Sequence, residues 1–373
     1  GFPLPIKTTQ LLYRSTGQLG QATVNVTSVV QPLLYFGPKK LVSYQSFYDS
    51  LNVDDEPSYA ISGGVTLGGL IPNVESLLIA PLLTQGYSIT IPDTQGQRAN
   101  FAAGPEYGMN TLDSLRATLS SREVGLPSTT KVALIGYSGG AIATEWAAEL
   151  APGYAPEIDK RIIGASMGGV LVQPLHNLHY VEGSLGWAGI MPAALIGISR
   201  SFDIDLKPYL NDYGLTLNER LQKASIINVL YQYPGLTWSA IAKPEYQIPE
   251  KIPVLVEAAN DLIMGTGGTP SAPLHIVQGS AGELEGTLGN KPGIGRGDGV
   301  MIAGDVRTLA RDYCSRGVKV QYGENPLLSH VGAAVQWIPE MLLWVNARFA
   351  GFSAPQNCSQ IPVGNPVEPT PLP

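Results

Sequence analysis

Short apolar runs alternate with longer amphipathic segments through most of the chain. Runs rich in β-branched and aliphatic residues, typical of buried strands, occur at residues 22–30, 41–47, 87–91, 131–135, 161–165, 253–257, 273–278 and 318–322. Apolar residues at helical spacing predict helices at residues 73–83, 107–119, 141–150, 306–315 and 337–349. Strands that alternate with helices predict an α/β fold, with a mainly parallel sheet covered by helices on both faces.

The pattern changes between Pro174 and about Pro249, where runs typical of buried strands are missing. Apolar helical stretches at residues 185–198 and 217–231 replace them. We interpret this region as a helical cap inserted into the core; helices that cover the sheet in the ordinary way are the alternative. The predicted division is a core at 1–173 and 250–360, a cap at 174–249, and a Pro-rich tail at 361–373 that is extended or disordered.

A motif with the pattern Gly-x-Ser-x-Gly links the expected strand at 131–135 to the helix that follows. It consists of Gly136, Tyr137, Ser138, Gly139 and Gly140. Such a nucleophile elbow places the serine on a tight strand-to-helix turn, across which side chains two residues before or after the serine would clash. The N-terminus of the following helix offers a backbone N–H and a favourable dipole to a developing oxyanion. The motif therefore predicts a serine nucleophile.

A second match to the same pattern surrounds Ser166, at residues 164–168. It also follows an expected strand, but the chain then reaches Pro174 without a helix-forming segment. Because the elbow requires a helix after the serine, we predict Ser138 rather than Ser166 as the nucleophile.

Four histidines can supply the general base that a serine hydroxyl needs. In α/β-hydrolases the chain order is serine, acid, histidine, with the histidine on a loop after the last strand. His330 follows the expected strand at 318–322 and precedes the last helix, so it is the predicted base. His176 and His179 come too early, at the start of the cap. His275 falls inside an expected buried strand, where a core histidine with satisfied hydrogen bonds is the simpler interpretation.

The acid that orients the histidine has competing candidates in Asp261, Asp298 and Asp305. Asp298 is followed by one helix, one strand and then His330, which is the expected order of elements. Asp261 directly follows the expected strand at 253–257 and would leave an additional strand between acid and base. Asp305 starts a helix. The order of elements therefore favours Asp298.

Composition narrows the classes of partner. The 373 residues include 23 Lys and Arg against 30 Asp and Glu, a net charge of −7, without a run of basic residues. A nucleic acid or an anionic membrane is therefore not expected as a partner. The longest apolar stretches are too short, or too broken by Gly and Pro, to span a bilayer. The histidines and cysteines lack the spacing of zinc ligands, and no metal or organic cofactor is implied.

Two cysteines, Cys314 and Cys358, form either a disulfide or a pair of unrelated buried thiols. We predict a disulfide that holds the C-terminal tail, which implies an oxidising compartment. The chain begins at Gly1 without a Met or a charged and apolar leader. We therefore expect a mature secreted protein whose signal peptide was removed or never cloned.

Several segments resemble the secretory lipases of fungi and actinobacteria, the family of Candida antarctica lipase A. The segments that carry the resemblance are 131–141, 150–156, 163–169 and 298–314, within a similar region at roughly 42–358. The resemblance implies an α/β-hydrolase with Ser138, Asp298 and His330 as catalytic residues. It also implies that the second motif, at Ser166, does not hold the nucleophile.

The same resemblance implies an oxyanion hole. In the family an aspartate after an early core strand contributes to it, and Asp49 in the segment 43–50 matches that residue. Asp49 would act through its backbone N–H, or through its side chain if burial keeps the carboxyl protonated; an ordinary turn aspartate is the alternative. The backbone N–H of Gly139 would be the second donor. The segment 279–297 looks like an insertion relative to the family that would cover or reshape the site.

The expected activity is hydrolysis of carboxylic esters with apolar acyl groups, through an acyl-enzyme on the serine. The apolar helices of the cap would line the acyl pocket. The expected partner is a lipid or other small ester, with transient contact to a lipid surface. An acyltransferase that uses an acceptor other than water, and an inactive hydrolase fold used for binding, are the alternatives.

Overall fold

The computed structural model describes residues 5–373, apart from the side chains of residues 76 and 77. Its described part contains a single eight-stranded sheet with the order β1-β2-β4-β3-β5-β6-β7-β8. The strands are β1 (Ile6–Thr16), β2 (Ala22–Pro32), β3 (Leu41–Gln45), β4 (Ser88–Pro92), β5 (Val132–Tyr137), β6 (Ile162–Gly168), β7 (Leu274–Gly279) and β8 (Val320–Asn325). β2 is antiparallel to β1 and β4, and the other neighbours are parallel. The predicted α/β fold with a mainly parallel sheet is confirmed.

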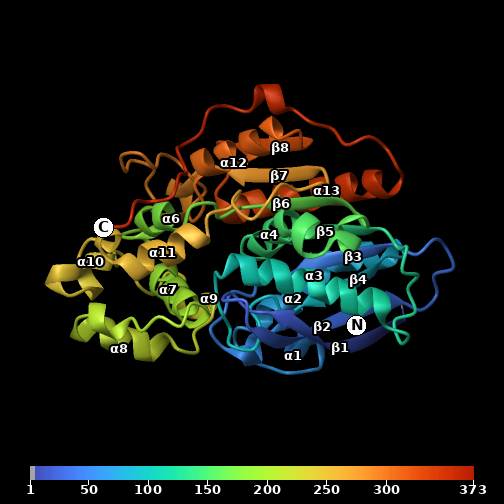
Figure 1. The fold of residues 1–373 in the computed structure, drawn as a ribbon, viewed down its shortest axis with the longest axis horizontal. Coiled ribbons are helices and arrows are strands. Elements are labelled where there is room, and N and C mark those ends of the chain that lie inside the picture. Colours follow the sequence, from blue (N-terminus) through green and yellow to red (C-terminus); the bar gives the residue numbers. More distant parts are fainter. Residues whose placement is uncertain (1–4) are drawn as a thin grey trace.

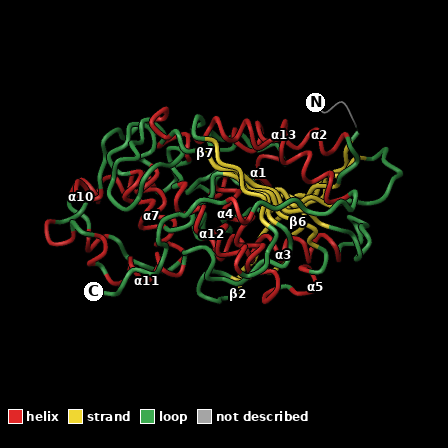
Figure 2. The backbone as a smooth tube through the Cα atoms, turned by 90° about the horizontal axis from the view of Figure 1, so that it is seen from above, coloured by secondary structure: helices red, strands yellow, loops and turns green. Residues whose placement is uncertain are grey.

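Helices cover both faces of this sheet (Figures 1 and 2). One layer contains α1 (Pro57–Ile61), α2 (Leu70–Thr84) and α13 (His330–Phe349), and the other contains α3 (Gly104–Ser120), α4 (Gly139–Tyr154), α5 (Pro156–Asp159) and α12 (Ala303–Ser315). Successive residues of β5 point to opposite layers: Leu134 packs in the cluster of α3 and α4, and Ile135 in that of α2 and α13. Because both faces are buried, β5 reads as a continuous apolar run.

A further group of helices lies beside the sheet, at the left of Figure 1. It consists of α6 (Pro174–Val181), α7 (Ile190–Ser201), α8 (Asp212–Leu221), α9 (Ile226–Val229), α10 (Trp238–Ile241) and α11 (Pro253–Asp261). These helices share a buried apolar cluster that includes Met191, Leu217, Trp238 and Leu255. Apolar helices therefore stand where the cap was predicted, and its limits at residues 174 and 249 stay a prediction. Short 3-10 helices occur at Val53–Asp55, Lys207–Tyr209, Pro244–Tyr246, Pro249–Lys251, Gly282–Glu285 and Cys358–Gln360.

The predicted strand at residues 253–257 is wrong, because this segment is the first part of α11. A short apolar run cannot be assigned to strand or helix from its periodicity alone. Pro253 suits the first position of a helix. The good helix formers from Glu257 to Ala259 continue the segment as a helix. Leu255, Val256 and Ala259 bury its apolar side. β7 is thus the first strand after the cap helices.

Two further elements differ from the hydrophobic pattern. The pattern does not predict β1, because this edge strand leaves most of its side chains partly or fully exposed and is largely polar. The predicted helix at 217–231 is divided into α8 and α9. The division arises because Ser225 forms a capping box with Asn228 and begins a new helix.

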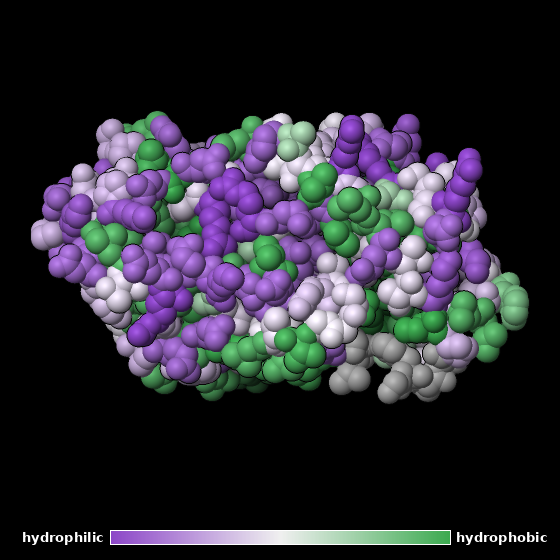
Figure 3. Space-filling model, turned by 90° about the horizontal axis from the view of Figure 1, so that it is seen from below, coloured by the Kyte–Doolittle hydropathy of each residue, from purple (hydrophilic) through white to green (hydrophobic). Residues whose placement is uncertain are grey.

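The surface drawn in Figure 3 is mostly hydrophilic over its left-hand part, and hydrophobic residues form separate patches elsewhere. Apolar surface in separate patches is ordinary for a globular protein. Among residues 5–373, no helix combines the length and the apolar character needed to cross a bilayer.

A disulfide joins Cys314, near the end of α12, to Cys358 at the start of the C-terminal tail, as predicted. Beyond it, residues 361–373 form no helix or strand, and they run back across α12 toward the cap helices. The Asn365 N–H donates to the carbonyl of Gly304 at 3.0 Å. The Thr370 N–H donates to Asn260 Oδ1 at 2.8 Å. The tail is therefore extended and held by hydrogen bonds.

Replacing Cys358 by Ser is expected to lower the free energy of unfolding by about 3–4 kcal/mol, because the bridge closes a loop across 44 residues and restricts the unfolded chain. Urea unfolding followed by tryptophan fluorescence measures this change. Wild-type protein unfolded in the presence of a reductant is the control and should lose the same stability. Equal stability of the bridged and unbridged forms would contradict the prediction.

Candidate active site

The turn between β5 and α4 leaves no room for side chains. Ser138 has φ 54° and ψ −120°, a strained conformation for a residue with a side chain. A Cβ on Gly136 would lie 2.2 Å from the carbonyl oxygen of Gly140, and a Cβ on Gly140 would lie 2.1 Å from that of Gln45 in β3. Glycine at both positions is thus a steric requirement of the turn that lifts the serine above the end of the sheet.

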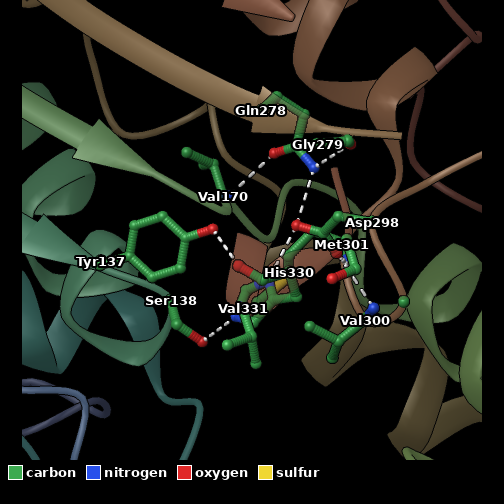
Figure 4. A network of polar contacts seen from close by, with 12 residues as sticks. Tyr137, Ser138, Val170, Gln278, Gly279, Asp298, Val300, Met301, His330 and Val331 are labelled. Carbon is green, nitrogen blue, oxygen red and sulfur yellow. Dashed lines mark hydrogen bonds and ion pairs between the residues drawn. The ribbon is translucent and has the colours of Figure 1, made fainter. Parts of the chain in front are cut away.

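Three side chains from separate parts of the chain form a continuous hydrogen-bonded series (Figure 4). His330 Nε2 lies 2.8 Å from Ser138 Oγ, and His330 Nδ1 lies 2.7 Å from Asp298 Oδ2. Asp298 is fully buried and His330 is 4% exposed. Because a carboxylate can only accept, the proton of the imidazole lies on Nδ1, and Nε2 is free to accept from the serine hydroxyl.

The carboxylate of Asp298 is fixed by three other donors. Its Oδ1 accepts from the N–H groups of Val300 and Met301 at 3.0 and 2.7 Å, and its Oδ2 accepts from Gln278 Nε2 at 3.0 Å (Figure 4). Gln278 lies in β7, next to its end. Gln278, a polar residue near the carboxyl end of a mainly apolar strand, is the feature of the sequence that could have indicated this contact.

His330 belongs to the first turn of α13, which begins there and not at residue 337 as predicted. Ser329 caps the helix by accepting a hydrogen bond from the Gly332 N–H at 3.4 Å. The His330 N–H donates to the carbonyl of Asp298 at 2.7 Å. Tyr137 of the elbow motif donates its hydroxyl to the carbonyl of His330, also at 2.7 Å. Backbone contacts thus hold the imidazole between its two side-chain partners.

The charges around His330 favour its protonated form. Burial lowers the pKa of the imidazole, but the charge and hydrogen bond of Asp298 act against it. The charge of Glu285 acts in the same direction as that of Asp298, as does Asp49 when it is ionised, and the net pKa of His330 is raised. This is the electrostatic setting in which an imidazolium that forms during a reaction is stabilised.

Asp49 lies against the same turn. A Cβ on Gly139 would lie 1.8 Å from Asp49 Oδ1, so a side chain at residue 139 would have to displace the Asp49 carboxyl. Asp49 is 8% exposed and has a positive φ of 37°. Burial, and then the charge of Glu75, raise the pKa of Asp49 to about 8, while the charge of His330 lowers it. The carboxyl is therefore protonated at neutral pH and can donate a hydrogen bond.

Glu75 of α2 stands behind Asp49 and is itself buried. It accepts hydrogen bonds from the hydroxyls of Tyr44 and Ser46 and from the N–H of Phe47, with 2.7 Å to Tyr44 and 2.9 Å to Phe47. Burial raises the pKa of Glu75 to about 7, although these three donors lower it. The segment after β3 thus rests on an acid that ionises near neutrality.

An apolar pocket begins at Ser138 and Gly139. Asp49 lines it at the same end. Most of the other lining residues are apolar and come from α6, α7 and α11: Leu178, Val181, Met191, Leu195, Ile198 and Leu255. The serine hydroxyl therefore faces a space suited to an apolar group.

The second Gly-x-Ser-x-Gly match has a different environment. Ser166 is fully buried in β6, where its hydroxyl lies 2.9 Å from His275 Nδ1 and accepts from Trp337 Nε1 at 3.1 Å. His275 Nε2 lies 3.6 Å from Glu340 Oε2. This group resembles a serine–histidine–acid series but is closed to substrate. His275 is a core histidine with satisfied hydrogen bonds, as the strand pattern indicates.

The other histidines and acids considered from the sequence do not belong to the hydrogen-bonded series of Ser138, His330 and Asp298. His176 Nδ1 pairs with Asp305 Oδ2 at 2.9 Å. His179 lies between Glu182 and Glu250, and the hydrogen bonds that its ring donates to these acids raise its pKa to about 9. Asp261 is exposed at the end of α11, so the structure does not bring it to His330.

Two residues near the imidazole have no signal in the sequence. The ring of Trp187 packs edge-on against that of His330, with 5.3 Å between centroids. Glu285 accepts a hydrogen bond from Trp187 Nε1 at 2.8 Å. Trp187 lies in an irregular segment before α7 and Glu285 ends a short 3-10 helix, so their meeting depends on how these two segments pack together.

Comparisons with known proteins agree with this architecture. The secretory lipase family matches residues 63–291. Lipase 2 of Candida albicans is 30% identical over 372 residues, covering 96% of this chain and 76% of that protein. A Mycobacterium tuberculosis protein named "Probable inactive lipase" is 29% identical over 354 residues, covering 94% of this chain and 75% of that protein. The structure of Candida antarctica lipase A in its closed state has a TM-score of 0.82 and 27% identity, covering 98% of this chain and 83% of that one.

The family match includes Ser138 and ends before Asp298 and His330, whose contacts are known from the geometry. The match extends over more than half of the sequence. This chain belongs to the secretory lipase family.

Proposed function

We propose that this protein hydrolyses carboxylic esters with apolar acyl groups through an acyl-enzyme on Ser138. The observation that carries the proposal is the series Ser138–His330–Asp298 at the end of an apolar pocket. A hydroxyl hydrogen-bonded to an imidazole, which is in turn hydrogen-bonded to a buried carboxylate, is the arrangement that acyl transfer by serine requires.

In the first half of the reaction, His330 Nε2 accepts the proton of Ser138 as Oγ attacks the ester carbonyl carbon. Asp298 stabilises the resulting imidazolium through the Nδ1–H bond. The carbonyl oxygen gains negative charge, and the N–H of Gly139 and the protonated carboxyl of Asp49 donate to it. The imidazolium then gives its proton to the leaving alcohol oxygen as the ester C–O bond breaks.

In the second half, water attacks the acyl-enzyme. His330 takes a proton from the water as its oxygen bonds to the carbonyl carbon. The tetrahedral species expels Ser138 Oγ, which recovers the proton from His330, and the carboxylic acid is released. The serine is thus regenerated, and the reaction consumes only ester and water.

The pocket supports an apolar acyl chain as the preferred group. A hydrocarbon chain that enters between α7 and α11 would exchange water contacts for side chains such as Leu195, Ile198 and Leu255, which favours binding in proportion to the apolar area buried. The lipase named among the relatives is consistent with lipid esters as substrates. The disulfide and the family membership support secretion into an oxidising compartment.

The name of the Mycobacterium tuberculosis relative makes inactivity a real alternative for this family. An inactive binding protein would not need the strained turn at Ser138 or the five polar contacts that align His330 and Asp298. Those features favour catalysis in this chain.

Ser138→Ala is expected to reduce kcat for p-nitrophenyl esters by about 10⁴-fold or more, because no other group in the site can form the acyl-enzyme. Ser166→Ala is the matched control, since it alters the same sequence pattern at a position closed to substrate, and it should keep most of the activity. Circular dichroism of both variants checks the fold. Equal losses in the two variants, or an active Ser138→Ala protein, would refute the proposal.

Asp49→Asn tests the oxyanion role through pH. The Asp49 carboxyl, with a pKa of about 8, loses its proton as the pH rises through that value and can then no longer donate to the oxyanion. Wild-type kcat is therefore expected to fall above about pH 8, whereas the amide of the variant donates at every pH and keeps kcat level. Initial rates across this range measure the difference. The same alkaline fall in both proteins would assign it to another group.

The pH dependence of stability tests independently whether Asp49 is protonated in the native protein. The native pKa of about 8 lies above the ordinary 3.8, so the native protein holds a proton that the unfolded chain releases between these values. The stabilisation that this proton contributes is complete below about pH 3.8 and is lost as the pH rises through about 8. The free energy of unfolding of Asp49→Asn, compared with that of wild type, should therefore rise by up to about 1.4 kcal/mol per pH unit between about pH 5 and pH 7. Urea unfolding at a series of pH values measures this difference. A constant difference would mean that Asp49 is an ordinary ionised turn aspartate.

A further inference from the structure

Glu285 is a buried acid that the reaction described above does not use. It ends the 3-10 helix Gly282–Glu285, within the segment 279–297, and its side chain is 8% exposed. Both carboxylate oxygens have a donor: Oε2 accepts from Trp187 Nε1 at 2.8 Å, and Oε1 accepts from the Val331 N–H at 2.9 Å. The carboxylate therefore bridges a residue that precedes α7 and the residue that follows His330.

The Trp187 side of this bridge reaches the imidazole. The indole is 6% exposed and meets the ring of His330 edge-on, with an interplanar angle of 82°. Trp187 also lines the apolar pocket. A displacement of the indole would therefore change both the wall of the pocket and one side of the imidazole.

The Val331 side holds the first turn of α13. The first three N–H groups of this helix have separate acceptors: the carbonyl of Asp298 for His330, the carboxylate of Glu285 for Val331, and the hydroxyl of Ser329 for Gly332. A carboxylate at a helix N-terminus is stabilised by the helix dipole. Glu285 thus contributes to holding the backbone that carries the base.

Glycines allow the close approach around the carboxylate. A Cβ on Gly299 would lie 2.9 Å from Trp187 Nε1 and 3.0 Å from Glu285 Oε2. A Cβ on Gly186 would lie 2.8 Å from the carbonyl oxygen of Glu285. The N–H of Leu185 donates to the carbonyl of Gly286 at 3.0 Å. The segment 279–297 and the residues before α7 are therefore joined by backbone as well as by side chains.

We propose that Glu285 is a positioning residue for His330: its carboxylate locks the indole of Trp187 and the first turn of α13 around the imidazole, and it adds a second negative charge to that of Asp298. This inference rests on the proposed function, in which His330 is the base. It assigns the segment 279–297 a part in setting the basicity of that histidine.

Groups other than Glu285 also face His330, and a test must distinguish the effect of Glu285 from theirs. Asp298 contacts Nδ1, Asp49 faces the imidazole from the end of β3, and Tyr137 of β5 donates its hydroxyl to the His330 carbonyl. Of the neighbouring acids, Asp298 raises the pKa of His330 most, Glu285 raises it further, and Asp49 does so when it is ionised. Removing the charge of Glu285 alone should therefore lower the pKa of His330 and leave the contact with Asp298 in place.

Glu285→Gln removes this charge and keeps one oxygen acceptor. The imidazole of His330 is expected to titrate about 0.5–1 pH unit lower, and the acid limb of kcat/KM should shift down by the same amount. Glu283→Gln is the matched control, because Glu283 lies in the same 3-10 helix but is exposed and pairs with Arg296. It should leave both values unchanged. NMR titration of the histidine resonances, assigned with His330→Gln, measures the pKa without substrate.

Trp187→Phe separates charge from packing. It keeps an aromatic ring beside the imidazole but removes the N–H donor and part of the packed ring, while the charge of Glu285 remains. The NMR titration of His330 is expected to stay within about 0.2 unit of wild type or to move upward. Equal downward shifts in Trp187→Phe and Glu285→Gln would overturn the assignment of the effect to the carboxylate.

The outcomes for this inference and for the proposed function are distinct. If Glu285→Gln leaves the titration of His330 where Glu283→Gln leaves it, Glu285 does not act on the base, whether or not the protein hydrolyses esters. If the titration shifts as expected but the wild-type protein hydrolyses no ester, the placement of Glu285 stands and the proposed function fails.

Discussion

The site depends on the contact between the turn at Ser138 and the end of β3. Gly140 lies against the carbonyl of Gln45, and Gly139 lies against the carboxyl of Asp49, with no space for a Cβ at either position. This close approach holds the serine in a backbone conformation that a residue with a side chain rarely adopts. It also places a protonated acid beside the first N–H groups of α4. One steric constraint thus positions the proposed nucleophile and oxyanion donors together.

The parallel sheet brings the remaining groups to the same edge. Ser138 follows β5, Asp49 follows β3, Asp298 lies beyond β7, and His330 lies beyond β8. Because these strands are parallel neighbours, their carboxyl ends meet at one side of the sheet, where open α/β folds place their ligands. Residues separated by up to 281 positions (His330 and Asp49) therefore share one site, and apolar side chains of α6, α7 and α11 line the pocket beside it.

The acids at this edge of the sheet have different surroundings. Asp298 keeps four hydrogen-bond donors around its side chain, which suits a carboxylate. Asp49 lies beside Ser138 at one end of the apolar pocket, and burial there raises its pKa to about 8. Glu285 has two donors, one from each of the segments it joins. Acids of the same kind can thus orient a base, donate to an oxyanion, or join the cap to the helix that carries the base.

The sequence by itself determined the elbow, because the glycines around Ser138 and the helix-forming run after it are local properties. The order of elements favoured Asp298 and His330 as the proposed acid and base, and the resemblance to the family supported the same pair. The sequence did not determine that residues 253–261 form a helix, since a short apolar run fits either element until its neighbours are known. Only the tertiary structure decided the proton on Asp49 and the partners of Glu285. Both depend on burial and on contacts between segments far apart in the chain, which no local pattern records.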